Sequence, residues 1–247
     1  EGFTGIHGDT DDDPVGQHAG AARDSREITA GFADDRGRFA GDGRFVHRGD
    51  ALDNLAVARN DLAGGRQLAD PVWGGIYQYS THGDWAHPHY EKLGQIQADY
   101  LRMFALGYAA FRDPADLATM RQLHAYLRGF LRSPDGAFYS SQDADVKPGE
   151  KATEYFKLSD QARRRVGIPR VDRHIYSREN GLIAAALVAA YLATDDHDML
   201  DDARRAVGFI TKHRGIPGGG FSHGERDVAG PYLADNLAML RAFLALH

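Results

Sequence analysis

An internal repeat constrains the fold of this chain more than any other feature of its sequence. A shift of 83 positions lays residues 108–138 over residues 191–221 without a gap. Each copy holds the end of an apolar helical segment, a short turn rich in aspartate, an amphipathic segment and a loop of the form Pro-x-Gly-x-Phe. Such repeats are typical of units that bury their apolar faces against their neighbours. The matching pairs are Tyr108 and Tyr191, Asp113 and Asp196, Leu117 and Leu200, Arg121 and Arg204, Tyr126 and Phe209, Leu127 and Ile210, Pro134 and Pro217, Gly136 and Gly219, and Phe138 and Phe221.

Helical periodicity dominates the sequence, and no alternating strand pattern exceeds a few residues. Strongly apolar segments, which we expect to be buried, alternate with amphipathic ones. Capping residues support these predictions, with Asp50 before one segment and Pro114 in the first turn of another. The chain is therefore predicted to be all-α. The predicted helices are residues 50–64, 89–111, 113–133, 176–193, 195–214 and 230–247.

Hairpins of one buried and one amphipathic helix predict an α/α toroid, which is a ring of helical hairpins. A superhelical solenoid is the alternative. The turn inside each hairpin is short, whereas the connections between hairpins are long and rich in aromatic and acidic residues. In a toroid these connections share one rim, so we expect the rim to be the functional face.

The first 24 residues differ from the rest of the chain. They lack an apolar period and are rich in glycine and aspartate, which predicts an extended or poorly ordered arm. A single toroid domain is expected over residues 25–247. Within it, the stretch RGRFAGDGRF at residues 36–45 is interpreted as a degraded earlier copy of the Pro-x-Gly-x-Phe loop.

Composition excludes several classes of function. The net charge of −6 gives no reason to expect nucleic acid or an anionic membrane as a partner. The longest apolar run, residues 181–193, is too short and too rich in alanine to insert into a bilayer. Absence of cysteine excludes disulfides, thiol catalysis and thiolate metal sites. No signal peptide is recognisable, and a start at Glu1 suggests that a preceding segment is missing, so the compartment stays unknown with a slight preference for an extracytoplasmic one.

Four clusters of polar and aromatic residues fall on the expected rim, at residues 73–92, 139–156, 172–181 and 218–236. Acids and hydroxyls beside aromatic rings suit the hydroxyl groups of sugars, and a pair of carboxylates is what cleavage of a glycosidic bond needs. The aromatic residues of the first cluster have two interpretations, because they could stack on a sugar ring or close the core beneath the loop. These residues are Trp73, Tyr77, Tyr79 and Trp85.

The first cluster also raises the question of a metal site. His87, His89 and Glu91 occupy every second position, so in an extended segment their side chains would point to the same side and could bind one metal ion. Pro88 and the predicted helix start interrupt this alignment, so we expect no metal here. The alternative is that Asp84 or His87 caps the helix and that Glu91 complements its positive end.

The second cluster contains Asp143, Asp145 and Glu154 at the first, third and twelfth positions of a calcium loop. Lys147 and Pro148 occupy positions that require a ligand and a glycine, which excludes an EF-hand. The three acids remain candidates for acid–base chemistry and sugar binding. The alternative interpretation is that they form Asx-turns that hold the backbone of their own loop.

The third and fourth clusters precede two apolar helices. Glu179, Asn180 and Asp235 lie in the first turns of these helices, where capping and the lining of a central cavity are both consistent with their chemistry. His174 and His223 lie in the preceding loops. Either histidine can act as a base only if a partner orients its ring.

Several motifs are distinctive: GGIYQYS, a following tryptophan and PHYEKL, and then SPDGAFYSSQDAD, EYF and SRENGLIAAALVAAY. The first three resemble GGIYDQLGGGFHRYS, a tryptophan and PHFEKM in the uncharacterised thioredoxin-domain proteins related to spermatogenesis-associated protein 20, and the others continue this match. The stretch GFADDRGRFAGDGRF resembles a degraded version of the family's motif GGFGGAPKF. The matching positions are Gly74, Gly75, His89, Glu91, Lys92, Asp143, Asp145, Glu154, Asn180 and Gly181.

The resemblance implies a fold more than an activity. It implies a six-hairpin-glycosidase-like α/α toroid, similar in architecture to glycosidases and to N-acylglucosamine and cellobiose epimerases. The thioredoxin domain and the glycine-rich LGGGFHR insertion are missing here, so no redox role is inherited. The predicted helices also fall short of the twelve that six hairpins need, so we expect an incomplete or trimmed ring with long rim loops.

Three functional hypotheses follow, and whether the protein is an enzyme is left open between the first two. The first is a sugar-directed hydrolase or epimerase without a cofactor, and the alternative is a non-catalytic module that binds or assembles with a protein partner. A metal-dependent enzyme is the third and weakest. The candidate catalytic residues are Glu91, Asp143, Asp145, Glu179, His89 and His174, and the candidate sugar-binding residues are Trp73, Tyr77, Tyr79, Trp85, Lys92, Glu154, Asn180 and Asp235.

Overall fold

The computed structural model describes residues 48–147, 152–226 and 231–247. The chain divides into two units, Glu1–Ala51 and Leu52–His247, and nearly all described residues belong to the second. The predicted arm and the interpreted loop copy at residues 36–45 lie outside the described residues. The predicted domain of residues 25–247 stays a prediction.

Helical hairpins build the second unit, as the sequence predicts. The first hairpin joins α2 (Gly94–Phe111) to α3 (Pro114–Tyr126), which continues as a π-helical turn, η1 (Leu127–Leu131). The second joins α6 (Ser177–Thr194) to α7 (His197–Arg214). The remaining long helices are α1 (Arg48–Gln67) and α8 (Leu233–Leu246).

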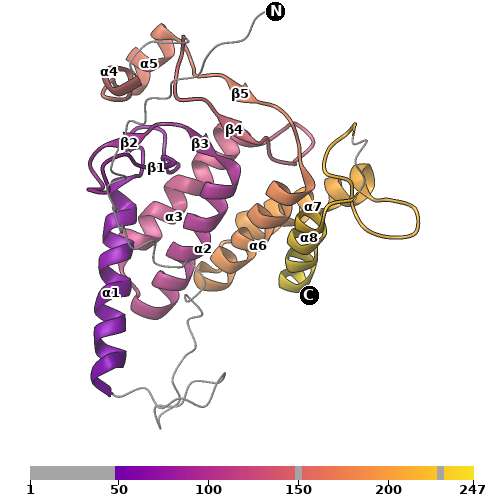
Figure 1. The fold of residues 1–247 in the computed structure, drawn as a ribbon, viewed down its shortest axis with the longest axis horizontal. Coiled ribbons are helices and arrows are strands. Elements are labelled where there is room, and N and C mark those ends of the chain that lie inside the picture. The colour runs from indigo at the N-terminus through magenta and orange to yellow at the C-terminus, as the bar shows by residue number, and fades with distance from the viewer. Residues whose placement is uncertain (1–47, 148–151, 227–230) are drawn as a thin grey trace, which may run out of the picture. The chain divides into compact units, whose positions relative to one another are not determined.

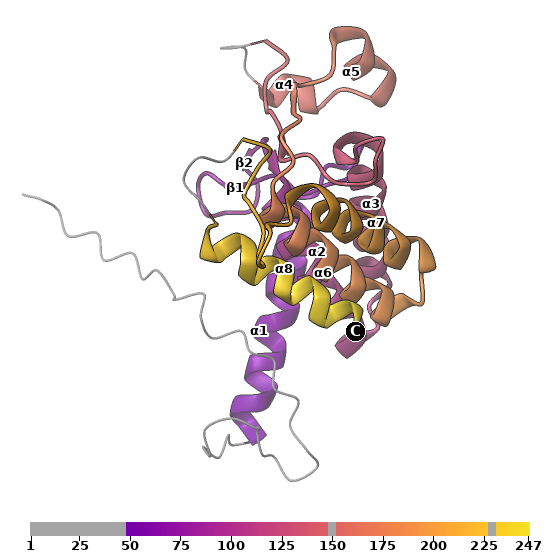
Figure 2. The same ribbon diagram turned by 90° about the vertical axis from the view of Figure 1, so that its right-hand side faces the viewer.

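Helix α6 packs between α2 and α8, so these three form an inner layer (Figure 1). Helices α3 and α7 lie together on the outer side of α2 and α6 (Figure 2). A missing side chain permits the contact between α6 and α8. A Cβ atom on Gly181 would lie 2.6 Å from the carbonyl carbon of Ala238, so only glycine fits at this crossing.

The repeat is reproduced in the structure residue by residue. Helix α6 begins and ends 83 positions after α2, and α7 begins 83 positions after α3. Asp113 and Asp196 cap α3 and α7 by accepting hydrogen bonds from backbone N–H groups of the first turn. Before them, Arg112 and Asp195 adopt the same left-handed conformation, with φ of 54° and 59°. The two hairpins are therefore copies of one unit.

The strands are only two residues long. β1 (Tyr79–Ser80) pairs with β2 (Pro88–His89), and β3 (Lys92–Leu93), β4 (Ser141–Gln142) and β5 (Val171–Asp172) form an antiparallel sheet with β4 in the middle. This sheet ties the connection before α2 to the one before α6. The predicted helix start at residue 89 is wrong, because pairing with β1 and β4 keeps the chain extended up to Leu93. The long connection before α6 also contains two short helices, α4 (Ala152–Phe156) and α5 (Asp160–Val166).

Each inner helix holds the preceding connection through a side-chain amide at its fourth position, an arrangement we call the amide clamp. Asn180 accepts a hydrogen bond from the N–H of Phe138 at 2.7 Å and donates one to its carbonyl at 3.0 Å. The same amide group donates to the carbonyl of Tyr176 at 2.9 Å. One side chain thus satisfies both polar groups of a buried loop residue and closes the first helical turn.

The clamp occurs three times among the described residues. Gln97, 83 positions before Asn180, binds both backbone groups of Ile76, and Asn236 does the same for Phe221. Every clamped residue also forms a β-bridge with the segment that follows the preceding outer helix. A third copy of the loop is therefore present at residues 69–76, and it is one residue longer than the other two. The bridges are Ala69 with Ile76, Arg132 with Phe138 and Gly215 with Phe221.

The outer helices are joined by a buried carboxylate on α7. Asp202 is bonded to His124 Nε2 at 2.9 Å and to Arg132 Nη1 at 3.0 Å, and Arg205 of its own helix also donates to it. Burial favours the neutral acid, but the hydrogen bonds from His124, Arg205 and Arg132 outweigh it and hold the pKa of Asp202 well below its ordinary value.

We expect Asn180→Ala to lower the free energy of unfolding by about 3 kcal/mol, because it leaves the buried N–H and carbonyl of Phe138 without partners. Asn236→Ala is the matched control. Its clamp is only half-buried, so water can replace the lost amide and the loss should be about 1 kcal/mol. Urea unfolding followed by circular dichroism at 222 nm measures both. Equal losses in the two variants would contradict the account.

Candidate functional site

An aromatic cluster gathers where the loops before α6 and α8 meet. The ring of Tyr176 lies nearly parallel to two imidazoles, those of His174 at 5.6 Å between centroids and of His223 at 4.2 Å. Tyr232, which precedes α8, meets His223 edge-on at 5.7 Å. Two histidines distant in the sequence therefore share one tyrosine at the N-terminal ends of neighbouring inner helices.

Each histidine is oriented by an aspartate. His174 Nδ1 lies 2.5 Å from Asp172 Oδ1, and His223 Nδ1 lies 3.0 Å from Asp235 Oδ1. An aspartate that accepts a hydrogen bond from Nδ1 fixes the ring and selects the tautomer in which Nε2 carries the lone pair. This is the arrangement that turns a loop histidine into a candidate general base.

Asp235 serves two elements at once. Its side chain is 1% exposed, and Oδ1 also accepts a hydrogen bond from the N–H of Arg178 in the first turn of α6 at 2.8 Å. A carboxylate of α8 therefore caps α6 while it orients His223. At the other pair, burial favours the neutral form of Asp172, but the hydrogen bonds from His174 and Ser140 hold its pKa below the ordinary value.

Glu179 occupies the position of α6 that Asp235 occupies in α8, directly before the clamp asparagine. Its side chain is 14% exposed, and Arg178 Nη1 lies 3.6 Å from Oε1. Within the described part of the chain, Oε2 is buried and has no hydrogen-bond partner. Buried polar atoms normally have partners, so this oxygen is unusual among the described residues.

His89 and Glu91 form a second pair in the connection before α2. His89 Nε2 lies 3.7 Å from Glu91 Oε2, and its ring stacks on Tyr79 at 5.1 Å between centroids. Both ionisable side chains are partly exposed. The pair thus combines two predicted catalytic residues with one predicted sugar-binding aromatic.

The structure places the acids of the second cluster in local roles. Asp143 Oδ1 accepts from the backbone N–H of Asp145 at 3.3 Å, which is the Asx-turn of the alternative interpretation. Asp145 and Glu154 line an open hollow beside α4, and Glu154 is ion-paired with Lys157 at 2.7 Å.

Two of the predicted aromatic residues close the core beneath the loop. Trp73 and Tyr77 are buried and pack with Tyr155 and Phe156 in a second, smaller core. Trp85 and Tyr79 remain partly exposed. Of the four, only Trp85 and Tyr79 present ring surface to solvent.

Lys92 lies inside the core, in a buried charged triad with Asp70 and Arg163. Asp70 Oδ2 accepts from Lys92 Nζ at 2.8 Å and from Arg163 Nη1 at 2.7 Å. Burial lowers the pKa of Lys92 to about 8, against the raising influence of Asp70. The triad joins the connection before α2 to α5. Asn180 also has a structural role, because its side chain forms the amide clamp of α6.

Sequence reasoning named His174, His223 and Asp235 but missed Asp172, Tyr176 and Tyr232. The missed signal is a second repeat, offset by 56 positions, in which YSREN at Tyr176 matches YLADN at Tyr232. It places a tyrosine, an acid and a clamp asparagine at the start of both helices.

No protein-family model matches the chain. In sequence it is similar to spermatogenesis-associated protein 20 of Mus musculus and of Homo sapiens, at 26% identity over 105 residues in each case. This match covers 42% of the chain and 13% of the relative. The chain thus matches only a small part of these relatives' length, and the resemblance found in the motifs is confirmed.

Solved structures give the fold. The chain is similar to a sugar epimerase from a ruminal bacterium, with a TM-score of 0.60, 16% identity and coverage of 78% of this chain and 49% of that one. Cellobiose 2-epimerase from Bacillus thermoamylovorans gives a TM-score of 0.61 and 18% identity, with coverage of 79% of this chain and 50% of that one. A family 76 glycoside hydrolase from a bovine Bacteroides thetaiotaomicron strain gives a TM-score of 0.57 and 15% identity, with coverage of 80% of this chain and 39% of that one.

The fold is that of an α/α toroid. This confirms the predicted all-α, six-hairpin-glycosidase-like class. The chain spans about half the length of the epimerases. Within the described residues, two complete hairpins and the single helices α1 and α8 make up its share of such a ring. Of the described helices, none has the length and apolar character that crossing a membrane requires.

We expect Asp235→Ala to lower the free energy of unfolding by about 2 kcal/mol, because the cap of α6 is lost. Asp235→Asn should cost less, because its amide oxygen still accepts from the N–H of Arg178. Urea unfolding of both variants measures the difference. Equal destabilisation by the two substitutions would show that the cap contributes little.

Asp70→Asn should lower the free energy of unfolding by about 3–5 kcal/mol, because it leaves two buried cations without a counter-charge. Glu154→Gln is the control, since it removes an acid from an exposed ion pair, which contributes little to stability. Thermal unfolding by calorimetry compares the two. A small effect of Asp70→Asn would contradict the view that Asp70 balances the charges of Lys92 and Arg163.

Proposed function

We propose that the protein is a sugar epimerase or isomerase in which His174 and His223 move a proton at the carbon beside the carbonyl of an open-chain sugar. One observation carries the proposal. Two imidazoles, each oriented by an aspartate, flank one tyrosine at the end of the inner layer where the long connections lie.

The chemistry needs an acid and a base but no redox cofactor. One imidazole removes the proton from the carbon next to the carbonyl, and the electron pair moves onto the carbonyl oxygen to give an enediolate. The other imidazole returns a proton to that carbon from the opposite face, which inverts it. Protonation of the neighbouring carbon instead, with a proton passing from the adjoining hydroxyl to the former carbonyl oxygen, isomerises the sugar. Imidazole suits both steps because it gains and loses a proton near neutral pH.

The surrounding residues have distinct roles in this proposal. Asp172 and Asp235 are positioning residues that hold the two rings. Tyr176 stacks against both imidazoles and helps to hold them in place. The Arg178 guanidinium, which lies beside Glu179, stabilises the negative charge that develops on the carbonyl oxygen.

Hydrolysis is the less favoured reaction. A glycosidase needs two carboxylates that act directly on the bond. Asp172 and Asp235 are engaged with histidines, and Asp143 is engaged with its own loop. The structures similar to this chain include a D-mannose isomerase as well as the two epimerases, and the same fold carries family 76 glycoside hydrolases.

A non-catalytic assembly module is the second candidate, and one surface favours it. Helix α8 exposes a leucine stripe at helical spacing, which another helical hairpin would cover. The stripe consists of Leu233, Leu237, Leu240 and Leu244, which are 82%, 42%, 53% and 68% exposed.

The direct test is solvent exchange. The chain is incubated in D₂O with glucose, mannose and cellobiose, and proton NMR follows the signal of the hydrogen at C2. We expect this signal to disappear as deuterium enters from solvent, together with the appearance of the epimer or the ketose. His174→Asn and His223→Asn should each slow the exchange by at least about 100-fold.

His197→Asn is the matched control, because His197 is an exposed histidine near an aspartate and away from the cluster. It should exchange at the wild-type rate. Circular dichroism confirms that each variant is folded. If the hydrogen at C2 of glucose, mannose and cellobiose did not exchange, the proposed epimerase or isomerase activity on these sugars would be contradicted. Cleavage of α-1,6-mannan without such exchange would favour a hydrolase.

A further inference from the structure

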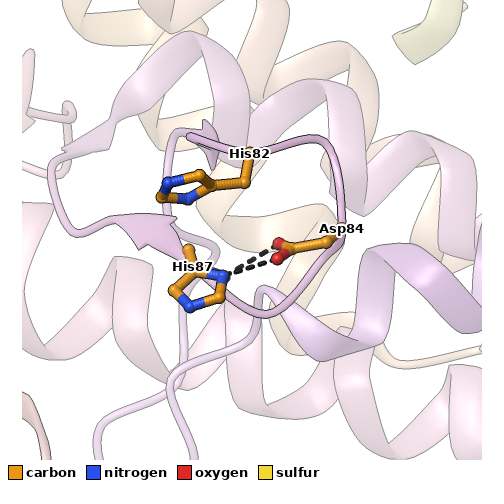
Figure 3. A group of neighbouring side chains, drawn as sticks. All are labelled: His82, Asp84 and His87. Atoms are coloured by element: carbon orange, nitrogen blue, oxygen red, sulfur yellow. Dashed lines mark hydrogen bonds and ion pairs between the residues drawn. The ribbon is translucent and has the colours of Figure 1, made fainter.

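A group of metal-ligand side chains lies in the loop between β1 and β2, apart from the histidine cluster. His82, Asp84 and His87 are exposed, and their ligand atoms lie within 4.8 Å of one another. Figure 3 shows the His82 ring above the His87 ring, with the Asp84 carboxylate beside His87. The two imidazole rings meet nearly edge-on, 4.6 Å apart between centroids.

We propose that His82, Asp84 and His87 form a binding site for a divalent transition-metal cation, with zinc as the preferred ion. Two imidazoles and one carboxylate are a donor set that zinc takes readily, and the fourth position would be open to water or a ligand. This site differs from the alternation of His87, His89 and Glu91 considered in the sequence, because only His87 is shared.

The loop is already built to hold these side chains. Ser80 Oγ donates to Asp84 Oδ1 at 2.9 Å and accepts from the N–H groups of Asp84 and Trp85. Asp84 Oδ1 also accepts from the N–H groups of Ala86 and His87. Oδ1 is therefore used by the backbone, while Oδ2 faces His87 at 2.5 Å. Little ordering remains to be done when an ion binds.

A hydrogen bond also selects the nitrogen of His82 that would bind the ion. The single proton of the Thr81 hydroxyl is donated to the carbonyl of His87 at 2.9 Å. The Thr81 oxygen, 3.0 Å from His82 Nδ1, therefore accepts from that nitrogen. Nδ1 carries the proton, so Nε2 carries the lone pair that a cation needs.

A small movement would bring Asp84 and His87 to the spacing that a bound zinc ion needs. Zinc bonds of 2.0–2.2 Å place neighbouring tetrahedral ligands about 3.3 Å apart. The cation would replace the proton between His87 Nδ1 and Asp84 Oδ2, and these atoms would move apart by less than about 1 Å. Since both side chains are exposed, no packed core opposes this shift.

Isothermal titration of the whole chain with zinc chloride tests the site. We expect one saturable binding event that His82→Ala, Asp84→Asn and His87→Ala each weaken by at least about tenfold. His197→Ala is the matched control, because His197 lies 3.7 Å from Asp195 but belongs to no metal-ligand group among the described residues. Magnesium should not bind, because it prefers oxygen ligands.

Tryptophan fluorescence gives an independent measurement, because Trp85 lies between two of the proposed ligands and the chain contains only one other tryptophan. Copper ions should quench Trp85 in a Trp73→Phe background, and His87→Ala should abolish saturable quenching. The proposal would be overturned if zinc failed to bind saturably, or if the three ligand variants bound it as tightly as the control variant.

Discussion

The amide clamp is the interaction on which the arrangement of this protein depends. A long connection that enters a ring of helices must satisfy its buried backbone groups, and the described strands, of two residues each, pair only a few of them. Gln97, Asn180 and Asn236 each supply one acceptor and two donors at the point where the loop meets the helix. The clamp therefore fixes where each connection ends and how each inner helix begins.

Placement of the proposed site follows from this constraint. The clamp of Asn236 fixes Phe221, two residues before His223, and the clamp of Asn180 closes the turn that Tyr176 begins. Ser177 then joins the two loops, because its N–H donates to the carbonyl of His223 at 2.9 Å and its Oγ donates to the carbonyl of Ser222 at 2.6 Å, so that His223 can stack on Tyr176. The asparagines need not touch a substrate to determine the geometry of the histidines.

Much of the fold could be predicted from the sequence, because the hairpin repeat contains no insertion and its caps recur at the same offset. The third loop copy was missed because residues 69–76 hold one extra residue and end in Ile76 instead of phenylalanine. The helix start near residue 89 was misplaced because strand pairing is a long-range contact. Long-range contacts also decide that Lys92 is buried beside Asp70, which the local pattern does not indicate.

The inner helices also explain why the histidine cluster lies at α6 and α8 and not at α2. Tyr176 and Tyr232 precede a turn that contains an acid directly before the clamp amide, whereas α2 has Leu93 and Ile96 at the same two positions. Asp235 of α8 caps α6 and orients His223, whereas Ile96 gives α2 no acid that could do either. The clamp is common to all three helices, and the tyrosine and the acid turn two of those ends into a chemical site.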